Sequence, residues 1–229
     1  MLTLAFDTSS KTASVSLLRD KAVLYDTIIN KSLNHSEVLL PAIDEACLLT
    51  GIQLPEIDLF ACTLGPGSFT GLRIGVSTLK GLMMATGKPA AGISTLAALA
   101  LNVQKKENMI CSMMDAGRGQ VYLAYYQYGK DGVLSQLEAA RALDPQSISY
   151  SSEGEVIYVG DGAIKYADLI SSFSTKNKIA SAEQQFICAS AVGALAIEKY
   201  HRNDLLDLAT CVPVYLRSTN AEPKKETLP

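Results

Sequence analysis

The chain has 229 residues and a formal net charge of −3, and hydrophobic residues make up 48% of it against 19% charged residues. This length suits one large domain or two small lobes, and the composition excludes a chain that is disordered throughout. The sequence contains no tryptophan, and aromatic residues make up only 7%. A weakly acidic chain with so few aromatic rings lacks the clustered cations and stacking surfaces with which a protein binds nucleic acid on its own.

The sequence also bears on the cellular compartment and on metal or nucleophilic chemistry. It holds no run of about 18 apolar residues, so we expect no membrane span, and its first residues lack the basic segment that opens a signal peptide. Its five cysteines are scattered and its two histidines are far apart. We therefore expect a cytoplasmic protein with buried free thiols, and we predict neither a catalytic residue nor a metal ligand.

The first half of the chain predicts a meander followed by alternating strands and helices. Three apolar runs separated by turn residues predict antiparallel strands at 2–7, 12–19 and 22–29. A helix should begin at Asn34, which forms a capping-box pattern with Glu37, and should end at Gly51, with a kink at Pro41. The elements predicted next alternate, which implies parallel pairing in the sheet: a strand at 58–64, a helix at 71–85, a strand at 90–93 and a helix at 95–103.

After the polar run 104–108 the pattern starts again. Strands are predicted at 109–115, 120–128, 133–141 and 155–160, helices at 161–172 and 187–201, and an extended segment at 212–216. The two halves have the layout of the duplicated α/β fold of actin, sugar kinases and Hsp70, in which each of two lobes is a mixed sheet with flanking helices. We assign residues 1–103 to an N-terminal lobe, 104–217 to a C-terminal lobe whose helix 187–201 is free to pack back on the first lobe, and 218–229 to a flexible tail.

The first predicted strand ends in Asp7, and a hydroxyl-rich turn that includes Thr8, Ser9 and Ser10 follows it. Such a turn can hold a metal-bound water and cradle a phosphate with its N–H groups and hydroxyls. An ordinary Asx or serine turn has the same residues. We retain Asp7, Ser9 and Ser10 as candidates for a vestigial phosphate site.

A glycine-rich loop at 65–70 leads from a predicted strand into the helix at 71–85. This is the arrangement of an anion site, although the spacing does not match a Walker loop. Arg73 in the first helical turn opposes the helix dipole at a cost of ~0.3–1 kcal/mol. We expect a carboxylate such as Glu37 to offset this cost, with a bound anion as the alternative.

The same helix carries a stripe of small residues about 100° away from its apolar stripe. Small residues permit the close approach of a second helix, which is either the chain's own helix at 34–50 or a helix of a partner. A tryptophan at Gly75 is then expected to block pairing while the monomer stays folded. The candidate partner-interface residues on the two helices are Glu37, Leu40, Asp44, Gly71, Arg73, Gly75, Thr78 and Leu82.

The turn Gly117-Arg118-Gly119 stands where a second phosphate loop would lie in a duplicated fold. A type I′ hairpin with an exposed Arg118 has the same residues. The sequence does not separate these two interpretations.

Several of these segments together resemble one family. The most specific is the run GPGSFTG-x-R-x-G at 65–75. The other matching segments are 35–37, 39–41, 80–81, 87–89, 92–96, and Asp115 with 118–122. Over residues 2–126 the chain resembles the TsaB family, which is also called YeaZ.

The resemblance implies a bacterial cytoplasmic subunit of the machinery that makes threonylcarbamoyladenosine beside the anticodon of tRNA. In that family the subunit pairs with its catalytic paralogue TsaD through two helices of the N-terminal lobe. TsaE, a P-loop ATPase, joins the complex, and TsaC supplies threonylcarbamoyl-adenylate. The resemblance further implies a homodimer when the subunit is alone, and contact with tRNA only through the complex.

The chain departs from the catalytic paralogue at two places. The paralogue's His-x-x-x-His metal pair is replaced here by the apolar stretch 93–99, and its Gly-Gly-His-Thr turn by 116–119. Carbamoyl transfer needs metal or phosphate contacts that hold the electrophile. We therefore expect a non-catalytic scaffold subunit without a cofactor of its own, which binds ATP or ADP weakly and only in the complex. The alternative is an ATP-dependent phosphotransferase that uses Asp7 and the two turns.

Overall fold

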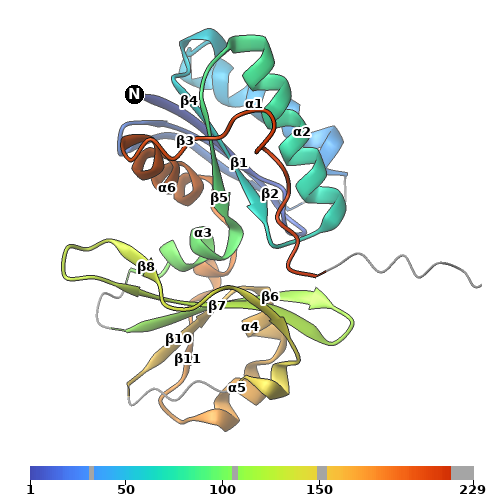
Figure 1. The fold of residues 1–229 in the computed structure, drawn as a ribbon, viewed down its shortest axis with the longest axis vertical. Helices are drawn as coiled ribbons and strands as arrows, with labels where there is room; N and C mark the ends of the chain where they lie inside the picture. Colours follow the sequence, from blue (N-terminus) through green and yellow to red (C-terminus); the bar gives the residue numbers. More distant parts are fainter. Residues whose placement is uncertain (31–33, 105–107, 149–153, 218–229) are drawn as a thin grey trace, which may run out of the picture.

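The computed structural model describes residues 1–30, 34–104, 108–148 and 154–217, and the predicted tail 218–229 lies outside them. The described residues form two β-sheets, one in each half of the chain, with helix α3 (Thr95–Leu101) between the sheets (Figure 1). The predicted fold class of two mixed sheets with flanking helices is confirmed. None of the helices in these ranges has the length and apolar character to cross a bilayer.

The N-terminal sheet has five strands in the order β3-β2-β1-β4-β5. The meander β1–β2–β3 is antiparallel, whereas β1, β4 and β5 pair in parallel, as the strand–helix alternation predicted. The strands are β1 (Leu2–Asp7), β2 (Ala13–Arg19), β3 (Ala22–Ile29), β4 (Leu59–Gly65) and β5 (Ala90–Ser94).

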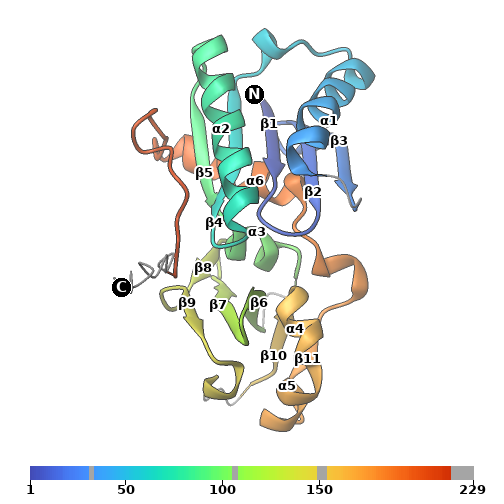
Figure 2. The same ribbon diagram turned by 90° about the vertical axis from the view of Figure 1, so that its right-hand side faces the viewer.

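Helices cover both faces of this sheet. Helices α1 (His35–Thr50) and α2 (Phe69–Thr86) lie on one face, and α6 (Ala189–His201) lies on the other (Figure 2). In β4, Phe60 and Cys62 pack in the cluster with α1 and α2, while Ala61 packs in the cluster with α6. The continuous apolar run of β4 follows from this double coverage.

The C-terminal sheet has the order β11-β10-β6-β7-β8, and β9 also pairs with β7. Helices α4 and α5 pack near β10 and β6, on the side away from α3 (Figure 1). The elements are β6 (Met109–Gly117), β7 (Gln120–Tyr128), β8 (Leu134–Gln136), β9 (Arg141–Leu143), β10 (Val156–Val159), α4 (Asp161–Lys165), α5 (Ala167–Phe173) and β11 (Lys178–Ile179). Short 3-10 helices lie at Leu54–Glu56, Pro145–Ser147 and Ala182–Gln185.

The chain after α6 returns along the N-terminal lobe, and we call residues 205–217 the C-terminal segment. Leu206 forms a bridge with Ala90 at the edge of the sheet. The backbone N–H of Val214 donates to the carbonyl of Leu64 over 2.7 Å. Arg217 then donates to the carbonyl of Ala116, in the hairpin between β6 and β7, over 3.2 Å. The segment therefore spans both halves of the molecule.

Three details differ from the sequence-based expectations. The predicted strand 133–141 is two short strands, β8 and β9, which pair with different parts of β7. The predicted helix 161–172 is interrupted at Tyr166, whose φ of −112° and ψ of 30° separate α4 from α5. At the start of α1 the capping box is absent, because the amide of Asn34 donates to the Glu37 carboxylate instead of accepting from the backbone. Gly51 ends α1 as predicted, in the left-handed conformation at φ 70°.

Candidate partner-binding surface and interlobe cleft

The side chain of Asp7 is fully buried at the end of β1. Its Oδ1 accepts hydrogen bonds from the Ser9 hydroxyl at 2.6 Å, the Ser9 N–H at 3.1 Å and the Thr63 hydroxyl. Burial raises the pKa of the carboxyl above its ordinary value, and the bonds from Ser9 and Thr63 oppose that rise. The residue thus organises its own turn, and its environment disfavours the ionised form that a cation requires.

Helix α2 packs directly on this turn. The Thr8 hydroxyl donates to the carbonyl of Gly71 over 2.8 Å, and the Ser68 N–H donates to the carbonyl of Ser9 over 2.7 Å. A β-carbon on Gly75 would stand 2.6 Å from the Thr8 hydroxyl oxygen, so only glycine fits there. Thr8 and Ser9 are also buried, and the Thr8 hydroxyl and the Ser9 hydroxyl and N–H are engaged by partners within the lobe.

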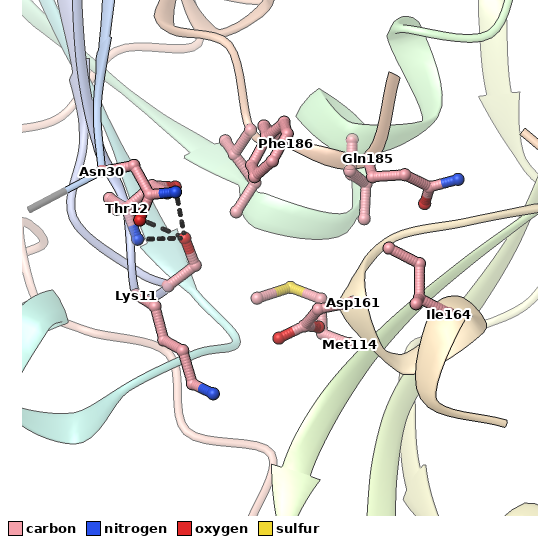
Figure 3. Close-up of a pocket in the computed structure, with 11 residues that line it drawn as sticks. Lys11, Thr12, Asn30, Met114, Asp161, Ile164, Gln185 and Phe186 are labelled. Carbon is pink, nitrogen blue, oxygen red and sulfur yellow. Dashed lines mark hydrogen bonds between the residues drawn. The ribbon is translucent and has the colours of Figure 1, made fainter. Parts of the chain in front are cut away.

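A cleft of about 230 Å³ lies between the two lobes. Figure 3 shows Lys11, Thr12 and Asn30 on one side and Met114, Asp161 and Ile164 on the other. Ser10 also lines it, and its hydroxyl lies 3.0 Å from that of Thr12. Of the three predicted phosphate-site residues, the structure brings only Ser10 to this cleft. The volume is below the ~300 Å³ at which small-molecule pockets begin.

The second predicted turn is a tight hairpin. Gly117 pairs with Gln120, and the two residues between them, Arg118 and Gly119, have φ values of 54° and 73°. Two successive positive φ values are those of a type I′ turn. Asp115 before the turn binds Lys165 at 2.8 Å. Burial favours protonation of Asp115, but the hydrogen bonds from Lys165 and Gly117 outweigh it and lower the pKa.

The face formed by α1 and α2 carries exposed apolar side chains. A groove of about 500 Å³ runs between the two helices. Its lining residues are Ser36, Leu39, Leu40, Phe69, Thr70, Arg73, Ile74, Ser77 and Thr78. On the same two helices Leu40 is 52% exposed, Met84 73% and Leu48 81%. The groove together with these exposed apolar side chains is a candidate interaction surface.

Arg73 stands at one end of this groove, where its partners differ from those expected. Its guanidinium lies over the ring of Phe69, with Cζ 3.8 Å from the ring centroid, and its Nε donates to the Tyr215 hydroxyl over 3.3 Å. No carboxylate in the described residues lies within ion-pair distance of Arg73, so the predicted pairing with Glu37 is wrong. The Glu37 carboxylate accepts from Asn34 instead.

The predicted interface residues divide between the surface and the interior. Those exposed or partly exposed are Glu37, Leu40, Asp44, Arg73 and Thr78, and those buried are Gly71, Gly75 and Leu82. The glycines of the predicted small-residue stripe face the Thr8 turn, and His35 at the start of α1 also lies beside Gly71, so they are not on the surface offered to a partner. Gly75→Trp is therefore not the surface probe that the sequence suggested, since it would displace Thr8.

The structure reveals a different small-residue stripe on the exposed side of α2. Ser77, Gly81 and Ala85 follow one another at spacings of four residues, and all three are exposed. A β-carbon on Gly81 would meet no atom within 4 Å. Helical spacing alone could have found this stripe, whereas no sequence signal indicated that Tyr215, 142 residues after Arg73, would reach the groove.

No group of three or more His, Cys, Asp or Glu side chains within the described ranges is placed to hold a metal ion. All five cysteines are free, as the scattered spacing suggested, and burial raises the pKa of Cys111 and Cys62 well above the ordinary thiol value. Cys62, Cys111 and Cys211 are buried as expected, whereas Cys47 and Cys188 are partly exposed.

Comparison with known proteins places the chain in a family. Residues 29–225 match the family model TsaD, tRNA N6-adenosine threonylcarbamoyltransferase. The tRNA threonylcarbamoyladenosine biosynthesis protein TsaB of Bacillus subtilis is 33% identical over 230 residues, covering 98% of this chain and 97% of that one. TsaB of Escherichia coli is 28% identical, with 98% of each chain covered.

Solved structures agree on the fold. YeaZ from Pseudomonas aeruginosa matches with a TM-score of 0.80 at 24% identity, over 94% of this chain and 99% of that one. Component A of the (R)-2-hydroxyglutaryl-CoA dehydratase of Acidaminococcus fermentans matches with a TM-score of 0.51 at 11% identity, over 88% of this chain and 99% of that one. With 33% identity along nearly the whole length of a curated relative, the chain belongs to the TsaB family, also called YeaZ.

Proposed function

We propose that this protein takes part in forming N6-threonylcarbamoyladenosine in tRNAs that read codons beginning with A, as a non-catalytic subunit that docks a TsaD-type transferase. The names of its relatives support the pathway. The observation that carries the docking role is the exposed groove between α1 and α2. A TsaE-type ATPase joins the pair in this proposal, and a TsaC-type enzyme supplies threonylcarbamoyl-adenylate.

The non-catalytic part of the proposal rests on the two turns. Asp7 and Ser9 are bonded to each other and covered by α2, and the turn at Arg118 is a closed hairpin. With the Thr8 hydroxyl and the Ser9 hydroxyl and N–H engaged inside the lobe, this chain would not activate a nucleotide or an acyl phosphate by itself. An ATP-dependent phosphotransferase, the alternative, would need Asp7 to face the cleft.

The exposed stripe Ser77, Gly81 and Ala85 explains how the docking would work. Small side chains at spacings of four residues let a partner helix approach α2 closely, and ridges of the partner then fill the groove beside Leu40. The same face would form a homodimer when the chain is alone. tRNA would be bound only by the assembled complex, in the cytoplasm.

The test is to mix the purified chain with the TsaD-type protein of the same organism and measure the mass of the complex. Gly81→Trp places a bulky ring on the docking face, and nothing in the fold opposes it. We expect this variant to lose the complex. Ser171→Trp, on the exposed side of α5 in the other lobe, is the matched control and should pair normally. Normal pairing of Gly81→Trp would exclude docking through α2.

A further inference from the structure

Three side chains form a stack at the N-terminal end of α2. The rings of Phe69 and Tyr215 lie 5.0 Å apart at an angle of 30°. The guanidinium of Arg73 lies over the Phe69 ring, with Cζ 3.8 Å from the ring centroid, and its Nε donates to the Tyr215 hydroxyl. Two of these residues belong to α2, and the third comes from the C-terminal segment, which runs beside α2 in Figure 1.

The stack orients the guanidinium of Arg73 but satisfies only part of its hydrogen-bonding capacity. Arg73 is the fifth residue of α2, one turn after Phe69, and its guanidinium is held by Phe69 and Tyr215. Its terminal guanidinium nitrogens have no hydrogen-bond partner among the residues that the structure describes. Holding so long a side chain in one orientation costs conformational entropy. The contacts with Phe69 and Tyr215 offset this entropy and leave the terminal N–H donors of the ordered guanidinium open to a group outside the chain.

The surroundings of Arg73 indicate the chemistry of that group. The groove that it lines has an apolar floor that includes Leu39, Leu40 and Ile74. A guanidinium on such a floor is only weakly screened by water once the groove is filled. Its planar fork of N–H donors matches a carboxylate, which it binds with two parallel hydrogen bonds.

We propose that Arg73 receives a carboxylate of the docked TsaD-type partner, and that Tyr215 is the positioning residue that holds Arg73 ready for it. This inference rests on the proposed docking through α1 and α2 and deepens it. It makes the C-terminal segment part of the partner-binding surface, although that surface is otherwise built by the two N-terminal helices.

The position of Tyr215 is itself fixed from both sides. The N–H of the preceding residue, Val214, donates to the carbonyl of Leu64. The carbonyl of Val214 packs so closely on Gly65 that any side chain at position 65 would collide with this carbonyl. Two residues after Tyr215, Arg217 donates to the Ala116 carbonyl at 3.2 Å and to the Gln120 side chain at 3.3 Å. The segment is thus tethered to β4 on one side and to the β6–β7 hairpin on the other.

The experiment measures the affinity for the purified TsaD-type protein by calorimetry at several salt concentrations. Arg73→Ala should weaken binding about 10- to 100-fold and flatten its salt dependence, because a desolvated charge pair is lost. Arg73→Lys keeps the charge but not the fork, so it should recover part of the salt dependence and little of the affinity.

Tyr215→Phe keeps the ring stack and removes only the hydroxyl. It should weaken binding about 2- to 10-fold, as expected for one lost hydrogen bond. In the Arg73→Ala background the same change should have no further effect, because Tyr215 acts only through Arg73. A separate, additive loss from Tyr215→Phe would show that it contacts the partner or supports the fold directly, and would overturn the positioning role.

Circular dichroism and thermal unfolding establish that each variant is folded, and the homodimer content of each is measured at the same concentrations. Native affinity and salt dependence in Arg73→Ala, with binding lost in Gly81→Trp, would overturn the carboxylate proposal and leave the docking face intact. Native affinity in both variants would overturn the docking face as well. A change confined to the homodimer would also overturn the proposal, because it would make a second copy of this chain the occupant.

Discussion

The hydroxyl of Thr8 donates its proton to the carbonyl oxygen of Gly71 over 2.8 Å and ties the turn after β1 to the first turns of α2. This contact is possible because α2 has no side chains at Gly71 and Gly75, where the backbone of the turn approaches the helix. The turn after β1, which the sequence suggested as a vestigial phosphate site, packs against a helix. Gly71 and Gly75 of α2 thus serve the interior of the lobe.

The first prediction contrasts two glycines of α2. Gly75→Ala should lower the free energy of unfolding by about 1–3 kcal/mol, because the new β-carbon would stand 2.6 Å from the Thr8 hydroxyl oxygen and overpack the site. Gly81→Ala should raise it by about 0.5–1 kcal/mol, since glycine is a poor helix former and the site is open. Urea unfolding of both variants measures the contrast. Equal changes in the free energy of unfolding of the two variants would contradict the packing of α2 on Thr8.

The second prediction concerns Asp7 and pH. Burial raises the pKa of Asp7 in the folded chain above 3.8, its ordinary value in the unfolded chain. The unfolded chain therefore releases this proton first as the pH rises. The stability that Asp7 contributes is fully present below pH 3.8 and is lost as the pH rises through the folded-state pKa.

This loss is measured as the difference in unfolding free energy between the native chain and Asp7→Asn from pH 4 to pH 8. Taking the difference cancels the other titrating groups to first order. We expect the native chain to lose stability relative to Asp7→Asn as the pH rises, because the amide stays neutral throughout. A difference that does not change with pH, or changes in the opposite direction, would contradict the burial of Asp7.

The third prediction concerns nucleotide. The isolated chain should bind ATP weakly or not at all and should not turn it over, because Thr8 and Ser9 are bonded within the lobe and Arg118 is at the tip of a hairpin. Calorimetry and a phosphate-release assay measure both quantities. Micromolar ATP binding that is lost in Asp7→Ala would contradict this prediction and favour the phosphotransferase alternative.

The fourth prediction concerns tRNA. The isolated chain, which carries a formal net charge of −3, should bind tRNA no better than the non-specific range of Kd ~10⁻⁴–10⁻⁶ M at physiological salt, and the complex should bind it much better. Reversing the charge of Lys224 and Lys225, which lie outside the described residues, tests whether the two chains share one tRNA surface. Weaker binding of tRNA by a complex that still pairs would support a shared surface. Tight, salt-sensitive binding by the isolated chain would contradict the scaffold role.

The sequence predicted most of the fold because the strands of the N-terminal sheet are continuous or alternating apolar runs, and the helices between them end at clear signals such as Gly51. It missed the division of 133–141 into β8 and β9, because two short edge strands carry too few residues to show a period. It also missed the break at Tyr166, which no proline or glycine marks.

The candidate site was predicted only in part, for a geometric reason. Helical spacing shows which residues share a face, but the direction of that face depends on neighbours far along the chain. The stripe of Gly71 and Gly75 therefore looked like a docking face, although Thr8 covers it. The position of Tyr215 beside Arg73 depends on the path of the C-terminal segment over β4, which no local pattern records.

Helix α6 covers one face of the N-terminal sheet, although it is synthesised long after the strands of that sheet. Its residues Val192 and Ala196 pack in one cluster with Ala5 and Ala61, and Gly193 lies directly against Leu18. During synthesis, the strands β1–β5 leave the ribosome well before α6, by roughly 10 s at rates of ~10 residues per second. Throughout that interval one apolar face of the nascent sheet stays in water and is open to wrong association. A nascent or truncated chain that ends before α6 should therefore aggregate or engage chaperones, and only the full-length chain should yield a soluble N-terminal lobe.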